Sequence, residues 1–138
     1  MNIIIADDQC LFREMLKEIL ELDSELKVLS TSSNGDVVLR ALEKHQENLL
    51  PEMAPDLMLL DINMPVKSGL DALAEIKSRY PQLKVCLLTT FEDDEKIRQA
   101  LALGADGYIV KDLRPKALQM AIKCIGEGMV VFHKDIAA

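Results

Sequence analysis

The sequence lacks several features on which other classes of protein depend. Its three cysteines, Cys10, Cys86 and Cys124, are widely spaced and odd in number, so they indicate neither a metal-ligand pair nor a disulfide framework. We interpret them as small buried apolar residues in a reducing compartment. Basic residues are scattered and in the minority, since 16 Lys and Arg stand against 23 Asp and Glu. The net charge of −7 therefore argues against DNA binding by this segment itself.

Long hydrophobic runs are also missing. No apolar run approaches the ~18 residues that a membrane-spanning helix needs. The N-terminus runs directly into a strand-like segment, without the basic region and cleavage site of a signal peptide. We therefore expect a cytoplasmic protein with no membrane partner. What the sequence does contain is 49% apolar residues over 138 positions, enough for the core of one ordinary domain.

Short apolar runs alternate with segments in which apolar residues recur at helical spacing. The runs predict five strands, at residues 3–6, 28–29, 57–60, 85–88 and 108–110. The helical spacing predicts five helices, at residues 12–20, 37–42, 70–77, 97–101 and 118–125. End signals agree with these helices, because Asn34 suits an N-cap, Gly104 suits the position after a helix and Pro115 suits a first turn.

Four of the five predicted strands are apolar throughout rather than alternating, which favours a parallel sheet covered by helices on both faces. The run at 28–29 is shorter and more polar, as expected of an edge strand. Right-handed crossovers restrict the topology to a doubly wound α/β sheet of five parallel strands with five helices. We place this domain at residues 1–128. Residues 129–138 extend the last helix, pack on the surface or begin a linker.

Polar residues stand at the carboxyl ends of the predicted strands, where open parallel sheets bind ligands. Asp7 and Asp8 follow the first strand and Asp61 follows the third, while Thr89 and Lys111 follow the fourth and fifth. Three carboxylates at one edge disfavour one another's ionisation, and a bound divalent cation removes that conflict. Because the donors are all oxygen atoms, the predicted cation is Mg²⁺.

These side chains fit phosphoryl transfer, in which positioning and positive charge do most of the catalysis. Asp61 is the expected nucleophile and would form an aspartyl phosphate. We expect Asp8 to bind Mg²⁺ directly, and Asp7 to bind it through water or to orient the site. Lys111 would supply a positive charge, and Thr89 a hydroxyl donor.

Each of these residues has an ordinary interpretation when it is taken alone. The acids Asp7, Asp8 and Asp61 could belong to turns. Thr89 could simply be the last β-branched residue of its strand, and Lys111 could form a solvated ion pair with its neighbour. The joint arrangement is what indicates a function, because four strand ends rarely bring such residues together by chance.

Four segments carry a resemblance to a known family. They are Ile3 to Asp8, Asp61-Ile62-Asn63-Met64-Pro65, Leu87-Leu88-Thr89-Thr90-Phe91 and Gly107-Tyr108-Ile109-Val110-Lys111-Asp112. Together they resemble the receiver domains of two-component response regulators, over roughly residues 1–128. The resemblance implies the flavodoxin-like strand order 2-1-3-4-5. It also implies a phosphoacceptor signalling domain rather than an enzyme, one that assists only its own phosphorylation and dephosphorylation.

The resemblance assigns roles to the matching residues. It implies phosphorylation of Asp61 and adds the main-chain carbonyl of Asn63 to the Mg²⁺ ligands. Lys111 matches the lysine that contacts the phosphoryl group, and Thr89 matches the hydroxyl residue that moves toward it. Tyr108 matches an aromatic switch residue, although alone it reads equally well as a half-buried core aromatic.

Further positions bear on the lifetime and surroundings of the phosphoryl group. Asn63 and Phe91 occupy positions that tune dephosphorylation in the family, and Phe91 could hinder an attacking water. Lys67 stands where small or acidic residues are more common, so it could change the local potential.

Thr-Thr-Phe at 89–91 and Lys-Asp at 111–112, where many receivers have Lys-Pro, make the sequence resemble the NarL/FixJ class more than other receivers. The implied partner is a sensor histidine kinase, and a homodimer on phosphorylation is the family expectation. Members of that class usually continue into a helix-turn-helix DNA-binding domain, and the tail at 129–138 resembles the end of their receivers. We therefore expect a longer natural protein that controls transcription. A stand-alone receiver that acts through protein–protein contacts is the alternative.

Other classes share part of the pattern. A haloacid-dehalogenase-like phosphohydrolase also forms an aspartyl phosphate, but it needs a second acid where this sequence has Asn63. A flavodoxin-like flavin carrier would need a Ser-, Thr- or Gly-rich loop after the first strand, where Asp7 and Asp8 would repel a phosphate. A degenerate receiver should have lost one or more acids, and all are present.

Overall fold

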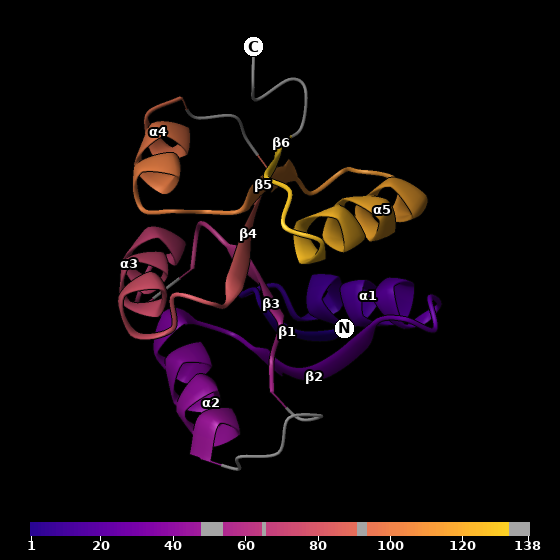
Figure 1. Ribbon diagram of the computed structural model, residues 1–138, viewed down its shortest axis with the longest axis horizontal. Helices are drawn as coiled ribbons and strands as arrows, with labels where there is room; N and C mark the ends of the chain where they lie inside the picture. The colour runs from indigo at the N-terminus through magenta and orange to yellow at the C-terminus, as the bar shows by residue number, and fades with distance from the viewer. Residues whose placement is uncertain (48–53, 65, 91–93, 133–138) are drawn as a thin grey trace.

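The chain forms a single parallel sheet with helices on both faces (Figure 1). The structure is a computed structural model that describes residues 1–47, 54–64, 66–90 and 94–132. The strands are β1 (Asn2–Ala6), β2 (Lys27–Ser32), β3 (Leu57–Asp61), β4 (Lys84–Thr89), β5 (Gly107–Val110) and β6 (Val131–Phe132). The helices are α1 (Cys10–Glu21), α2 (Gly35–Glu47), α3 (Gly69–Arg79), α4 (Asp94–Ala102) and α5 (Pro115–Gly126).

The strands follow the order β2-β1-β3-β4-β5-β6, and all neighbouring pairs are parallel. The predicted order 2-1-3-4-5 is confirmed, with β6 added beyond β5. β6 pairs Val131 with Gly107 and Phe132 with Tyr108. The sequence does not predict β6, because a strand of two residues shows no periodicity. Val131 and Phe132 therefore enter the sheet, while the domain boundary at residue 128 stays a prediction.

Helices α2, α3 and α4 cover one face of the sheet, and α1 and α5 cover the other (Figure 1). Because successive strand residues point to opposite faces, each central strand contributes to two separate cores. Ile4 and Met58 pack with the α2–α4 side, whereas Ile3 and Leu57 pack with the α1 and α5 side. Burial on both faces is the reason why the central strands are apolar throughout.

The end signals of the sequence coincide with the helix ends. The Asn34 side-chain oxygen accepts a hydrogen bond from Val37 N at 3.0 Å, just before α2. Gly104 adopts a φ of +92° after α4, a conformation in which other residues are strained. Pro115 is the first residue of α5. The edge position of β2 is also confirmed, although β2 is longer than predicted.

The three cysteines differ in their surroundings. Cys86 is buried in β4, as predicted, and Cys124 is partly buried in α5. The prediction is wrong for Cys10, which is exposed because the first turn of α1 begins at the solvent-facing edge of the sheet. Within the described ranges, none of the helices has the length and apolarity needed to cross a bilayer.

Candidate functional site

The turn after β1 holds Asp7 in a fixed position. Asp7 is fully buried, and its backbone N–H donates to Ser32 O of β2 at 2.9 Å. One carboxylate oxygen accepts a hydrogen bond from Gln9 N at 2.8 Å. The Arg13 guanidinium donates to the main-chain oxygen of Asp7 at 2.6 Å. These contacts direct the Asp7 carboxylate into the edge of the sheet, whereas the next residue, Asp8, is exposed.

Asp61 is the last residue of β3 and is only 3% exposed. Its Oδ1 accepts a hydrogen bond from Asn63 N at 3.2 Å. The first residue of α3, Gly69, packs against this strand end, and its N–H donates to Ile62 O at 3.0 Å. A Cβ atom at Gly69 would lie 2.3 Å from the Asp61 carbonyl oxygen. Only glycine therefore allows α3 to begin so close to Asp61.

The carboxylates of Asp7, Asp8 and Asp61 form an acidic cluster. One oxygen from each lies within 4.8 Å of the others. Burial and the neighbouring Asp7 charge raise the pKa of Asp61 to about 6, against the opposing effects of the Asn63 hydrogen bond and the Lys111 charge. Three carboxylate oxygens at this spacing fit a hard divalent cation such as Mg²⁺, whose charge would remove the repulsion. The cluster brings together the three acids that the sequence predicts.

Lys111 follows β5 and reaches the same cluster. Its Nζ lies 2.7 Å from Asp7 Oδ2 and 3.4 Å from Asp61 Oδ2, and its side chain is only 8% exposed. The ammonium group also donates to Gln9 Oε1 at 3.1 Å and lies 4.6 Å from the centre of the Phe12 ring. Lys111 is thus held within the site, and the interpretation as a solvated surface pair is wrong.

Thr89 lies on β4, the strand next to Asp61, and Tyr108 lies on β5, the strand on the far side of β4. Thr89 ends β4, is 2% exposed, and its main-chain oxygen accepts a hydrogen bond from Lys111 N at 2.7 Å. Tyr108 is fully buried in the core on the α2–α4 side, where it pairs with Leu87 of β4. The half-buried position considered for Tyr108 is therefore wrong. Thr89 lies at the same edge as the acids, whereas Tyr108 lies two residues before the end of β5.

The structure adds residues that the sequence does not single out. Gln9 and Phe12 contact Lys111, as described above, and Lys96 of α4 donates to Asn63 Oδ1 at 2.9 Å. Gln9 could have been found because it directly follows the two acids at positions 7 and 8. No local pattern points to Lys96, because its contact depends on how α4 packs beside the loop after β3. Lys67, which the sequence does single out, instead pairs with Glu75 of α3. Phe91 lies outside the described residues.

Comparisons with known proteins agree with this geometry. The response regulator receiver domain family matches residues 3–123. The transcriptional regulatory protein LnrK of Bacillus subtilis is 38% identical over the whole chain, which spans 59% of LnrK. DegU of Brevibacillus brevis is 33% identical over 99% of this chain and 54% of its own length. The chain thus spans a little over half the length of these curated relatives.

Solved structures show the same fold. A DNA-binding response regulator of the LuxR family from Staphylococcus aureus superposes with a TM-score of 0.80 at 27% identity, over 91% of this chain and 98% of that chain. The signal receiver domain of NarL from Mycobacterium tuberculosis superposes with a TM-score of 0.82, also at 27% identity, over 92% of this chain and 96% of that chain. These matches confirm the predicted fold and its similarity to NarL-type receivers.

Proposed function

This chain belongs to the response regulator receiver family, and from that premise we propose that Asp61 accepts a phosphoryl group from a sensor histidine kinase. The observation that carries the proposal is the position of Asp61, clustered with the Asp7 and Asp8 carboxylates and 3.4 Å from the Lys111 ammonium. A nucleophilic carboxylate beside a fixed cation is what transfer of a phosphoryl group requires. The family is one of signalling domains, and we propose that this member assists only its own phosphorylation and dephosphorylation.

The proposed reaction joins one Asp61 carboxylate oxygen to phosphorus. As this O–P bond forms, the bond between phosphorus and the histidine nitrogen of the donor breaks, and the imidazole leaves with its electron pair. Lys111 Nζ, 3.4 Å from Asp61 Oδ2, is placed to neutralise charge on the transferring oxygens. The Asp7 carboxylate, 2.7 Å from the same ammonium, keeps Lys111 oriented toward the site.

The acidic cluster is the proposed Mg²⁺ site. Asp8 and Asp61 would bind the ion directly, with the main-chain carbonyl of Asn63, and Asp7 would bind it through water. This assignment is supported by the spacing of the three carboxylates and by the resemblance to the family. When bound, Mg²⁺ supplies positive charge to the phosphoryl oxygens and relieves the repulsion that raises the pKa of Asp61.

Thr89 and Tyr108 are the proposed switch residues. Thr89 ends the strand next to Asp61, so that its hydroxyl can follow a new phosphoryl group. The Tyr108 ring is fully buried on the α2–α4 side of the sheet, in the strand beside the one that Thr89 ends, which supports a role next to Thr89. Phosphorylation would shift an existing equilibrium toward a state in which the Tyr108 ring turns inward, rather than create a new state.

The proposed output is transcription, through a helix-turn-helix DNA-binding domain outside this sequence, and dimerisation is the proposed response to phosphorylation. The proposal is supported by the relatives that are transcriptional regulatory proteins and of which this chain spans only a part. The net charge of −7 is consistent with an output made elsewhere, because this segment offers few basic residues to DNA.

Intact-mass measurement with a small phosphodonor tests the proposal. Acetyl phosphate should add one phosphoryl group to the wild type in the presence of Mg²⁺ and none without it. Asp61→Asn should remain unmodified. Asp56→Asn is a matched control, because Asp56 directly precedes β3, at the opposite end of the strand that Asp61 ends. Modification of Asp61→Asn, or turnover of many equivalents of donor to free phosphate by that variant, would contradict the assignment.

A further inference from the structure

A chain of two hydrogen bonds joins helix α4 to the proposed phosphoacceptor. Lys96 Nζ of α4 donates to Asn63 Oδ1 at 2.9 Å. Asn63 N in turn donates to Asp61 Oδ1 at 3.2 Å. Asn63 therefore contacts Asp61 through its backbone and α4 through its side chain. Lys96 is in this way separated from the Asp61 carboxylate by one residue.

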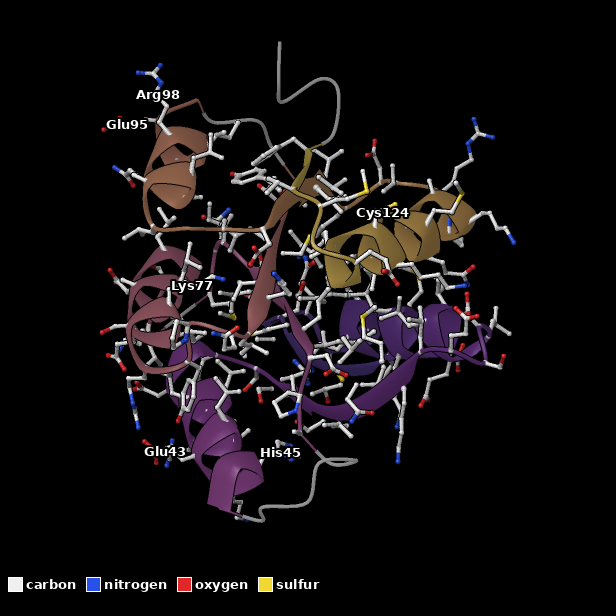
Figure 2. The ribbon with its side chains drawn as sticks, in the orientation of Figure 1. Glu43, His45, Lys77, Glu95, Arg98 and Cys124 are labelled. Carbon is white, nitrogen blue, oxygen red and sulfur yellow. The ribbon has the colours of Figure 1, made fainter. Side chains whose placement is uncertain are left out.

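Helix α4 holds Lys96 on the side that faces the site. Ile97 and Ala100 anchor the helix, because they are buried in the core on the α2–α4 side of the sheet. Glu95 and Arg98 are exposed and project from the outer side of α4 (Figure 2). Lys96 is partly buried between these two sides, where it reaches the loop after β3. The packing of α4 on the sheet thus determines the direction in which the Lys96 side chain points.

Lys96 and Lys111 approach the site from opposite faces of the sheet. Lys111 lies over the ring of Phe12, which packs in the core under α1 and α5. Lys96 belongs to α4, which covers the other face (Figure 1). Lys111 contacts the two buried carboxylates directly, whereas the contact of Lys96 passes through Asn63. The two lysines therefore have different tasks.

We infer that Lys96 is a positioning residue for the phosphorylation of Asp61 and that it acts through the side chain of Asn63. The inference rests on the proposed function of Asp61. The Lys96 ammonium group donates to the side-chain oxygen Oδ1 of Asn63, and this restricts the backbone whose N–H binds the Asp61 carboxylate. Because coupling between two sites is reciprocal, a phosphoryl group that moves Asn63 also acts on α4 through Lys96.

Lys67 provides a matched control. It lies four residues after Asn63 in the sequence, closer than Lys96, yet its ammonium pairs with Glu75 of α3. The Lys96→Met and Lys67→Met variants lose the same charge and keep the same unbranched side chain. Only the first loses a contact with the site.

The test measures the rate constant of phosphorylation by acetyl phosphate at saturating Mg²⁺, from intact mass against time. The variants are Lys96→Met, Lys96→Arg and Lys67→Met, each made with Asn63 and with Asn63→Ala. ¹⁵N spectra of the side-chain amide of Asn63 report the contact without any reaction. Thermal denaturation shows whether each variant is folded.

We expect Lys96→Met to slow phosphorylation by about two- to fivefold, the size expected for losing one partly exposed charged contact. Lys96→Arg should retain most of the rate, and Lys67→Met should match the wild type. The Asn63 side-chain amide signal should shift in Lys96→Met and stay in place in Lys67→Met. In the Asn63→Ala background, Lys96→Met should have no further effect.

Two results would overturn the inference while leaving the proposed function intact. One is a Lys96→Met rate equal to that of the wild type. The other is an equal effect of Lys96→Met with and without the Asn63 side chain, which would mean that Lys96 acts by another route. A wild-type chain that takes no phosphoryl group would instead overturn both the proposed function and the inference.

Discussion

Among the described residues, carboxylates meet a lysine at both edges of the sheet, one to one at the amino edge and three to one at the carboxyl edge. At the amino edge, Asp106 precedes β5, and its Oδ2 accepts hydrogen bonds from Lys77 Nζ at 2.7 Å and Val85 N at 2.9 Å. Lys77 lies on the side of α3 toward the sheet and also donates to Leu83 O at 2.9 Å (Figure 2). The Asp106 carboxylate, the Lys77 ammonium and the nearby backbone groups thus provide hydrogen-bond partners for one another.

At the carboxyl edge, the acids outnumber the base that contacts them. Asp7, Asp8 and Asp61 cluster together, and Lys111 is the lysine that pairs with two of them. The pKa of Asp61 rises to about 6, which shows that ionisation is disfavoured there. The ion pair at the amino edge therefore stabilises the fold. The carboxyl edge retains an excess of negative charge, at the expense of stability, that a cation can neutralise.

The amino edge should be the more sensitive to loss of an acid. Asp106→Ala leaves the Lys77 ammonium and the Val85 N–H without their carboxylate partner. The side chains of Lys77 and Asp106 are only 16% and 17% exposed. We therefore expect the free energy of unfolding to fall by about 3 kcal/mol, as for a largely buried pair that loses one member. Urea denaturation of the variant and the wild type measures this difference in the free energy of unfolding.

An exposed ion pair serves as the control for this variant. Glu43 Oε1 lies 2.8 Å from Arg79 Nη2, and both side chains are 45% exposed. Glu43→Ala should change the free energy of unfolding by less than about 1 kcal/mol. If Asp106→Ala lowered the free energy of unfolding no more than Glu43→Ala does, the ion pair at the amino edge would not stabilise the fold.

The carboxyl edge should respond in the opposite direction. Asp61 has a folded-state pKa of about 6, above the ordinary value of 3.8, so folding disfavours its ionised form. Asp61→Asn should therefore raise the free energy of unfolding above pH 6, by up to about 3 kcal/mol. As the pH falls from about 6 to about 4, wild-type Asp61 becomes protonated in the folded state and the difference should disappear. Urea titrations at several pH values, without Mg²⁺, measure this.

Mg²⁺ gives a second way to test the same repulsion. At pH 7.5 the ion should stabilise the wild type more than Asp61→Asn, and so reduce the difference between their free energies of unfolding. If that difference, measured without Mg²⁺, stayed constant from pH 4 to pH 8, burial and charge at Asp61 would not be its cause.

Much of this arrangement can be read from the sequence, because buried parallel strands leave a strong pattern. Four runs are apolar throughout, and each delivers its next residue to one edge, so the sequence alone places Asp7, Asp61, Thr89 and Lys111 together. The short strand β6 could not, since its position depends on pairing with β5 rather than on any pattern in two residues.

The contacts around the strand ends are harder to predict than the strand ends themselves. Lys67 is near Asp61 in the sequence but pairs with Glu75, whereas Lys96 is far along the chain and contacts Asn63. Phe12 meets Lys111 because α1 passes beside the end of β5. Sequence distance gives no information about which lysine reaches the site. The packing of the helices on the sheet determines which lysine contacts the site.

Backbone strain at the carboxyl edge gives the smallest expected effect. Val66, in the loop between Asp61 and α3, has a φ of +68° and is the one non-glycine residue with a positive φ among those the structure describes. A β-branched side chain is unfavourable there, and 80% exposure means that little packing offsets it. Val66→Asn should therefore raise the free energy of unfolding by about 1 kcal/mol. Val130→Asn is the control, because Val130 is also exposed but has no positive φ. Equal effects of the two substitutions would mean that the loop beside Asp61 stores no strain, and that the cost of the carboxyl edge comes from its charges alone.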